Sequence, residues 1–170
     1  FLSGNPPSDP GFRGEPYDVE TPEPSKTAKR HGKSARVALS RRATWAGADL
    51  KVSKHVTLGE HAAFEGAYTI EHLGGAAVDA FFGVEMNYNL LAGEAHDRYY
   101  YHEHQGNAGK LATVADFGTL SYVGLKDHWL NVALTLRSSP PAHVVVSPVR
   151  TVSQSEGGFE AVYQSSCVVV

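Results

Sequence analysis

The chain has 170 residues, a formal net charge of −3 and a hydrophobic fraction of 42%. This length fits one domain, large enough to bury a core without covalent cross-links. The small negative charge gives no general attraction to nucleic acid, and no apolar run reaches the roughly 20 residues of a membrane helix.

Residues 1–25 hold most of the prolines of the chain, mixed with Gly, Ser and Asp. Such a composition predicts an N-terminal, proline-rich arm or linker without periodic structure. Residues 26–170 are then expected to form the folded domain. Because the first residue is Phe1 and the chain ends on an apolar run, Val168 to Val170, we expect a fragment of a longer protein, incomplete at both ends.

Basic side chains cluster between residues 26 and 42. Val37 and Leu39 alternate there with Arg36 and Ser40. This pattern predicts a strand whose solvent-exposed face carries the charges. No aromatic residues are interleaved with these charges for base stacking. We therefore expect no nucleic-acid partner.

Beyond this segment apolar residues recur with period two, which is typical of half-buried β strands. The alternating stretches are 50–58, 64–70, 80–91, 130–137, 143–152 and 159–170. Gly74-Gly75, Gly106-Asn107 and Pro140-Pro141 are turn signals between them. The pattern predicts an all-β fold, a sandwich or a barrel.

The stretch 80–91 has an unusual polar face made of Glu85, Asn87 and Asn89. Side chains two residues apart on a strand project the same way, about 6.5 to 7 Å apart. This spacing suits hydrogen bonds to a polyhydroxy ligand. The alternative is that these groups only form hydrogen bonds with neighbouring loops and with water.

Asp97, Arg98 and three consecutive tyrosines, residues 99–101, follow this stretch. Tyrosine rings stack on the apolar faces of sugars, and Asp and Arg anchor hydroxyl groups. A carbohydrate site is one interpretation. The other is that Tyr99 and Tyr101, which share a strand face, belong to the core.

Other chemistry finds little support in the sequence. His96, His102 and His104 lack clear further ligands, so we expect no metal site, and no motif indicates a cofactor. Cys167 cannot form an internal disulfide, which favours a reducing, cytoplasmic location. It lies in an apolar strand, where burial raises the pKa of a thiol and makes it a poor nucleophile.

The stretch 153–160 carries two carboxylates, Glu156 and Glu160, on either side of Gly157 and Gly158. Glycosidases need two carboxylates that face each other across a bond, but sequence alone does not show such facing. The consecutive glycines predict a sharp bend between two strands.

Three segments resemble a known family. They are residues 148–166 (PVRTVSQSEGGFEAVYQSS), residues 82–93 (FGVEMNYNLLAG) and residues 95–100 (AHDRYY). They are similar to the C-terminal domain of α-amylase and 4-α-glucanotransferase enzymes of glycoside hydrolase family 57, over residues 12–170. The resemblance implies an antiparallel β-sandwich of the galactose-mutarotase-like supersandwich type. It also implies that the catalytic residues belong to a preceding (β/α)-barrel.

Together these observations predict a non-catalytic C-terminal domain that contacts an α-glucan or maltooligosaccharide and supports the catalytic (β/α)-barrel of the same polypeptide. The expected carbohydrate-binding residues are Glu85, Asn87, Asn89, Asp97, Arg98, Tyr99, Glu156, Glu160 and Gln164. One alternative is a mutarotase-type aldose epimerase with Glu85 or Glu156 as base and His96 as acid. Another is a purely structural domain with an exposed apolar patch.

Overall fold

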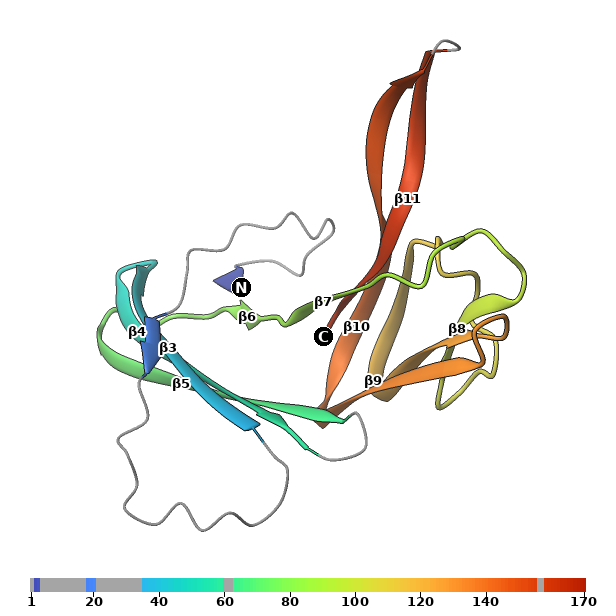
Figure 1. Cartoon of the computed structure of the whole chain (residues 1–170). Helices are drawn as coiled ribbons and strands as arrows, with labels where there is room; N and C mark the ends of the chain where they lie inside the picture. The colour runs from blue at the N-terminus through green and yellow to red at the C-terminus, as the bar shows by residue number, and fades with distance from the viewer. Residues whose placement is uncertain (1, 4–17, 21–34, 60–62, 156–157) are drawn as a thin grey trace. The chain divides into compact units, whose positions relative to one another are not determined.

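A computed structural model describes residues 2–3, 18–20, 35–59, 63–155 and 158–170 (Figure 1). Every regular element within these ranges is a β strand, and the strand pairings are antiparallel. The predicted all-β antiparallel class is confirmed, and the strand content is consistent with a β-sandwich. The chain divides into two compact units, Arg13–Ala80 and Phe1–Phe12 with Phe81–Val170. The predicted boundary at residues 25 and 26 lies outside the described residues.

The unit Arg13–Ala80 contains a four-stranded sheet in the order β2-β3-β4-β5. Its strands are β2 (Asp18–Glu20), β3 (Ala35–Trp45), β4 (Ala48–Leu58) and β5 (Phe64–Gly75). Ala46 and Gly47 both have positive φ, the conformation of a two-residue turn whose twist matches that of the strands it joins. Leu50 and Val52 are buried as their alternation predicts.

The second unit contains a five-stranded sheet in the order β7-β11-β10-β9-β8 and a small pair, β1-β6. The small pair is β1 (Leu2–Ser3) and β6 (Phe81–Phe82). The larger sheet consists of β7 (Glu85–Tyr88), β8 (Arg98–His102), β9 (Ala115–Asp127), β10 (Val132–Ser155) and β11 (Gly158–Val169). Strands β7 and β8, which carry two of the predicted sugar-binding groups, form its two edges.

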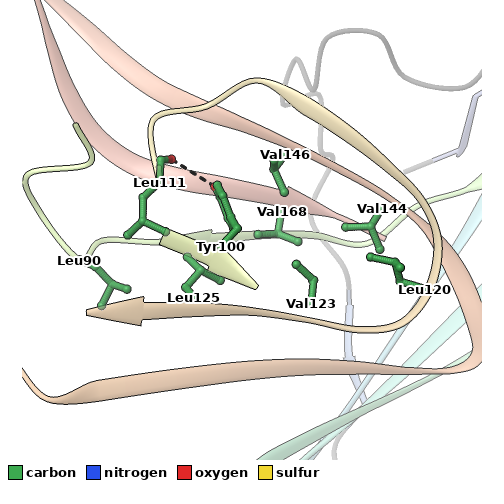
Figure 2. Close-up of a cluster of buried hydrophobic side chains, with 9 residues drawn as sticks. All are labelled: Leu90, Tyr100, Leu111, Leu120, Val123, Leu125, Val144, Val146 and Val168. Atoms are coloured by element: carbon green, nitrogen blue, oxygen red, sulfur yellow. Dashed lines mark hydrogen bonds between the residues drawn. The ribbon is translucent and has the colours of Figure 1, made fainter. Parts of the chain in front are cut away.

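One face of this sheet packs into an apolar core (Figure 2). The buried side chains are Leu90, Tyr100, Leu111, Leu120, Val123, Leu125, Val144, Val146 and Val168. Tyr100 keeps its polar end satisfied because its hydroxyl donates to the carbonyl of Leu111 at 3.2 Å. The middle tyrosine of the triplet is therefore the core residue. The alternative that placed Tyr99 and Tyr101 in the core is wrong, because both lie on the opposite face and are partly exposed.

Two predicted strand boundaries differ from the observed ones. The stretch 80–91 is not one strand: β6 ends at Phe82, β7 begins at Glu85, and the chain turns at Leu91 and Ala92, which have positive φ. Pro140-Pro141, predicted as a turn, lies inside β10. The register between β10 and β9 shifts between Arg137 and Ala142, and such an irregularity accommodates residues that cannot donate a backbone hydrogen bond.

Strands β10 and β11 continue beyond the rest of their sheet as a two-stranded ribbon, which is visible in Figure 1. We call its described part, residues 150–155 and 158–163, the arm. The pairing of β11 with β7 stops at Ser166, and that of β10 with β9 stops at Val146. Within the described residues the two strands of the arm therefore pair only with each other.

Candidate functional site

The first predicted group lies at the β7 edge of the five-stranded sheet. Glu85 and Asn87 project from one side of β7 as predicted, and the Asn87 Nδ2 donates to the Glu85 Oε1 at 2.9 Å. Asn89 lies just after the strand, where its Oδ1 accepts the backbone N–H of Leu91 at 3.3 Å. Part of the hydrogen-bonding capacity of this group is thus used locally.

The second group lies at the opposite edge, around the start of β8. The Arg98 Nε donates to the Oδ2 of Asp127 at 2.8 Å, and the Arg98 side chain also contacts Asp97 at 3.2 Å. The Asp127 side chain is fully buried. Arg98 is therefore committed to the interior of the domain, and this ion pair reduces its availability to a ligand.

Asp127 also organises the turn from β9 to β10. Its Oδ1 accepts the backbone N–H of Leu130 at 2.9 Å, as Asp commonly does in turns. Burial acts to raise the pKa of Asp127, but the backbone N–H of Leu130 and the guanidinium of Arg98 outweigh it and hold the pKa below its usual value. The carboxylate therefore remains charged inside the protein.

Tyr99 is the member of this group that lies on the outer face, which we define as the face of the five-stranded sheet opposite the core. Its hydroxyl is hydrogen-bonded to Nε2 of His128 at 3.0 Å, and the two ring centroids are 5.5 Å apart. The Tyr99 ring is partly exposed. It has the fixed position and open surface that a stacking residue needs.

The third group lies on the arm and near its base. Glu160 is exposed on β11, and the Gln164 Nε2 donates to Thr151 Oγ1 at 2.9 Å across the ladder. Glu156 lies outside the described residues. The predicted residues therefore occupy three places along one sheet, its two edges and its extension, and they form no single cluster within the described residues.

The outer face also carries residues that sequence reasoning did not select. Tyr101 lies beside Tyr122 at a centroid distance of 6.4 Å, and the Arg137 guanidinium lies 4.9 Å from the Tyr122 centroid. The Tyr101 hydroxyl is hydrogen-bonded to Thr135 Oγ1 at 2.7 Å. We call Tyr99, Tyr101, Tyr122, Thr135 and Arg137 the tyrosine face. In the sequence, the pattern that could have indicated this face was the alternation of Tyr99 and Tyr101 about Tyr100, which the structure buries.

Register explains why these side chains meet. Tyr99 pairs with Lys126, Tyr101 with Gly124, and Tyr122 with Arg137. Residues directly opposite in neighbouring strands project from the same face. The five residues of the tyrosine face come from β8, β9 and β10, and the register of these strands is not visible in the sequence.

The histidines and the cysteine show little reactive potential. The ring centroids of His102 and His104 are 6.0 Å apart. The pKa of His102 is lowered, mainly by burial and to a smaller extent by the neighbouring His104. Among the described residues no group of three His, Cys, Asp or Glu side chains is placed to hold a metal ion. Burial, with Glu85 nearby, raises the pKa of Cys167 to about 12, which confirms the prediction of a poor nucleophile.

Comparison with solved structures establishes the class of fold. The chain matches the crystal structure of 4-alpha-glucanotransferase from Thermococcus litoralis with a TM-score of 0.58 and 19% identity over 92% of its own length. It spans 20% of that chain. Together with the antiparallel sheets, this match defines a β-sandwich domain.

The particular family follows from the sequence as a whole. The family model described as alpha-amylase/4-alpha-glucanotransferase, C-terminal, matches residues 11–170, and the chain belongs to this family. This confirms the resemblance carried by residues 82–93, 95–100 and 148–166. No curated protein matches the chain. Within the described residues no helix is long and apolar enough to cross a membrane.

Proposed function

We propose that the chain is the non-catalytic C-terminal domain of an α-glucan-active glycoside hydrolase or glucanotransferase, where it contacts the glucan and supports the catalytic domain of the same polypeptide. The family match over residues 11–170 is the observation that carries this proposal. The chain spans only 20% of the solved enzyme that it resembles in fold. That proportion fits an accessory part of a larger enzyme.

The arm favours the supporting role. Val152 and Phe159 are 69% and 81% exposed, and they lie opposite Ala161 and Gln154, in two rows of the ladder that are separated by the Ser153–Glu160 row. Side chains in these rows share one face of the ribbon. A two-stranded ribbon is only marginally stable in water by itself. We propose that the catalytic domain of the same polypeptide covers this apolar face.

Contact with glucan is the second part of the proposal. The predicted residues of the β7 edge, Glu85, Asn87 and Asn89, offer carboxylate and amide groups, and Tyr99 offers a partly exposed ring. Glu160 and Gln164 add exposed polar groups near the arm. Such groups suit a neutral ligand rich in hydroxyls, because hydrogen bonds fix its orientation while rings cover its apolar faces.

Calorimetric titration of the purified 170-residue chain with a maltooligosaccharide tests the glucan contact. We expect saturable heat release. A cello-oligosaccharide of the same length, which differs in the geometry of its linkage, is the matched control and should bind more weakly. If the maltooligosaccharide releases no heat above the dilution heat, the domain does not contact glucan by itself and this part of the proposal is wrong.

A further inference from the structure

We infer that the tyrosine face is the surface on which the glucan lies. This inference rests on the proposed function for the chemical class of the ligand, and it goes further by assigning the main binding surface to residues of β8, β9 and β10, beyond the β7 edge. Three features support it: the positions of the rings, the polar groups around them, and the burial of the outer face at β11.

Tyr101 provides a flat ring that lies along the sheet. It pairs with Gly124 of β9, and a Cβ atom at that glycine would overlap the Tyr101 ring. The ring therefore crosses β9 and reaches β10, where its hydroxyl donates to the Leu134 carbonyl at 3.1 Å. Only glycine leaves room for this arrangement. The Tyr101 side chain remains partly exposed.

Two more rings extend this surface, with Tyr99 two residues away on the same strand and Tyr122 beside Tyr101 on β9. Side chains two apart on a strand lie roughly 7 Å apart. His128 holds Tyr99 through a hydrogen bond, and Arg137 lies over Tyr122. Because these contacts already fix the rings, little side-chain entropy remains to be lost when a ligand binds.

The groups around the rings match a polyhydroxy ligand. Thr135 and Arg137 are exposed on β10 beside Tyr101 and Tyr122, and they offer a hydroxyl and a guanidinium for hydrogen bonds. Rings for the apolar faces of sugars, bordered by polar groups for the hydroxyls, form the combination that carbohydrate recognition requires. A chain of glucose units can contact several rings at once.

The outer face is less accessible near β11 than at the tyrosine face. Cys167 and Val169 are 1% and 4% exposed, and they are paired with Asn87 and Glu85 of β7. In contrast, Thr135 and Arg137 are exposed. Asn87 and Glu85 also bond to each other. The outer face is thus open on β10 beside the rings and closed at β11.

Titration of variants of the 170-residue chain with a maltooligosaccharide tests the location. We expect Tyr101→Ala to weaken binding at least about tenfold, because it removes the central ring. Gly124→Ala should have a similar effect, since the added methyl group displaces the ring without deleting it. Asp116→Asn, an exposed aspartate on β9 that belongs to none of the proposed contacts, is the control and should bind as the unaltered chain does. Thermal melting of each variant establishes that the fold is retained.

The outcomes separate the two proposals. Loss of binding in Tyr101→Ala and Gly124→Ala, with Asp116→Asn unaffected, supports the tyrosine face. If the unaltered chain binds and both tyrosine-face variants bind equally well, the location is wrong while the glucan contact stands. If the unaltered chain does not bind, both are wrong.

Discussion

Strands β10 and β11 pass through two regions that differ in burial although their sequences look alike. Where they run inside the sheet, Val146 and Val168 are fully buried. In the arm, Val152 and Phe159 are largely exposed on the same two strands. The difference comes from the neighbours, because β9 and β7 flank the first region and end before the second. Alternation thus identifies a strand without showing what covers it.

The largest effect is expected from a cavity in the sheet region. Leu125→Ala removes a side chain that is 1% exposed and belongs to the core cluster. Substitutions of this kind leave an unfilled volume, and we expect a loss of about 4 kcal/mol in the free energy of unfolding. Urea denaturation of the 170-residue chain measures it. A loss below about 1 kcal/mol would mean that the core in this region repacks freely.

A somewhat smaller effect is expected from the buried ion pair of the same region. Asp127→Asn leaves Arg98 without its buried charge partner, and we expect a loss of about 3 kcal/mol. The Asn side chain still accepts the Leu130 N–H, which limits the loss. Urea denaturation at neutral pH measures the difference, and Asp116→Asn, an exposed aspartate on the same strand, is the control.

The same pair predicts a dependence on pH. The pKa of Asp127 is lower in the folded chain than in the unfolded one, where it is about 3.9. Its contribution is therefore fully present above that value and is lost as the pH falls through the lower, folded pKa. The unaltered chain should lose more stability than Asp127→Asn between pH 5 and acid pH. Parallel acid curves for the two proteins would contradict this prediction.

The smallest effect is expected in the arm. In the 170-residue chain Phe159→Ser should change the free energy of unfolding by less than about 0.5 kcal/mol, because the ring is already exposed. In the polypeptide that contains the catalytic domain, the same change should lower the temperature at which activity is lost by roughly 3 °C or more. Ser153→Ala, in a row on the other face of the ribbon, should change neither. Equal behaviour of Phe159→Ser in both proteins would contradict the supporting role of the arm.

Local patterning predicted the elements of this fold better than their partners. The alternation of residues 50–58 and 159–170 indicates strands, and both are found. The break at residues 83–84 was missed because the apolar alternation continues through it. The continuity of β10 across Pro140-Pro141 was missed because two prolines normally indicate a turn. In both cases a non-local pairing decided the outcome.

The candidate site shows the same limit. Glu85 and Asn87 project together as predicted, since period two fixes their direction. Arg98 was expected to meet a ligand but pairs with Asp127, a residue 29 positions away. Only the register between β8 and β9 places these two side chains together. Tyr101 was left between two interpretations because its position depends on Gly124, which no local pattern connects to it.

Because Cys167 is buried, chemical labelling of its thiol can report when β11 separates from the strands beside it. Alkylating reagents react with thiolates, and a buried thiol with a pKa of about 12 near the end of β11 is both protonated and inaccessible. The rate at which iodoacetamide modifies this chain therefore measures how often β11 separates from its neighbours. Since the sequence contains one cysteine, such labelling needs no engineered probe, and a covering catalytic domain should slow it.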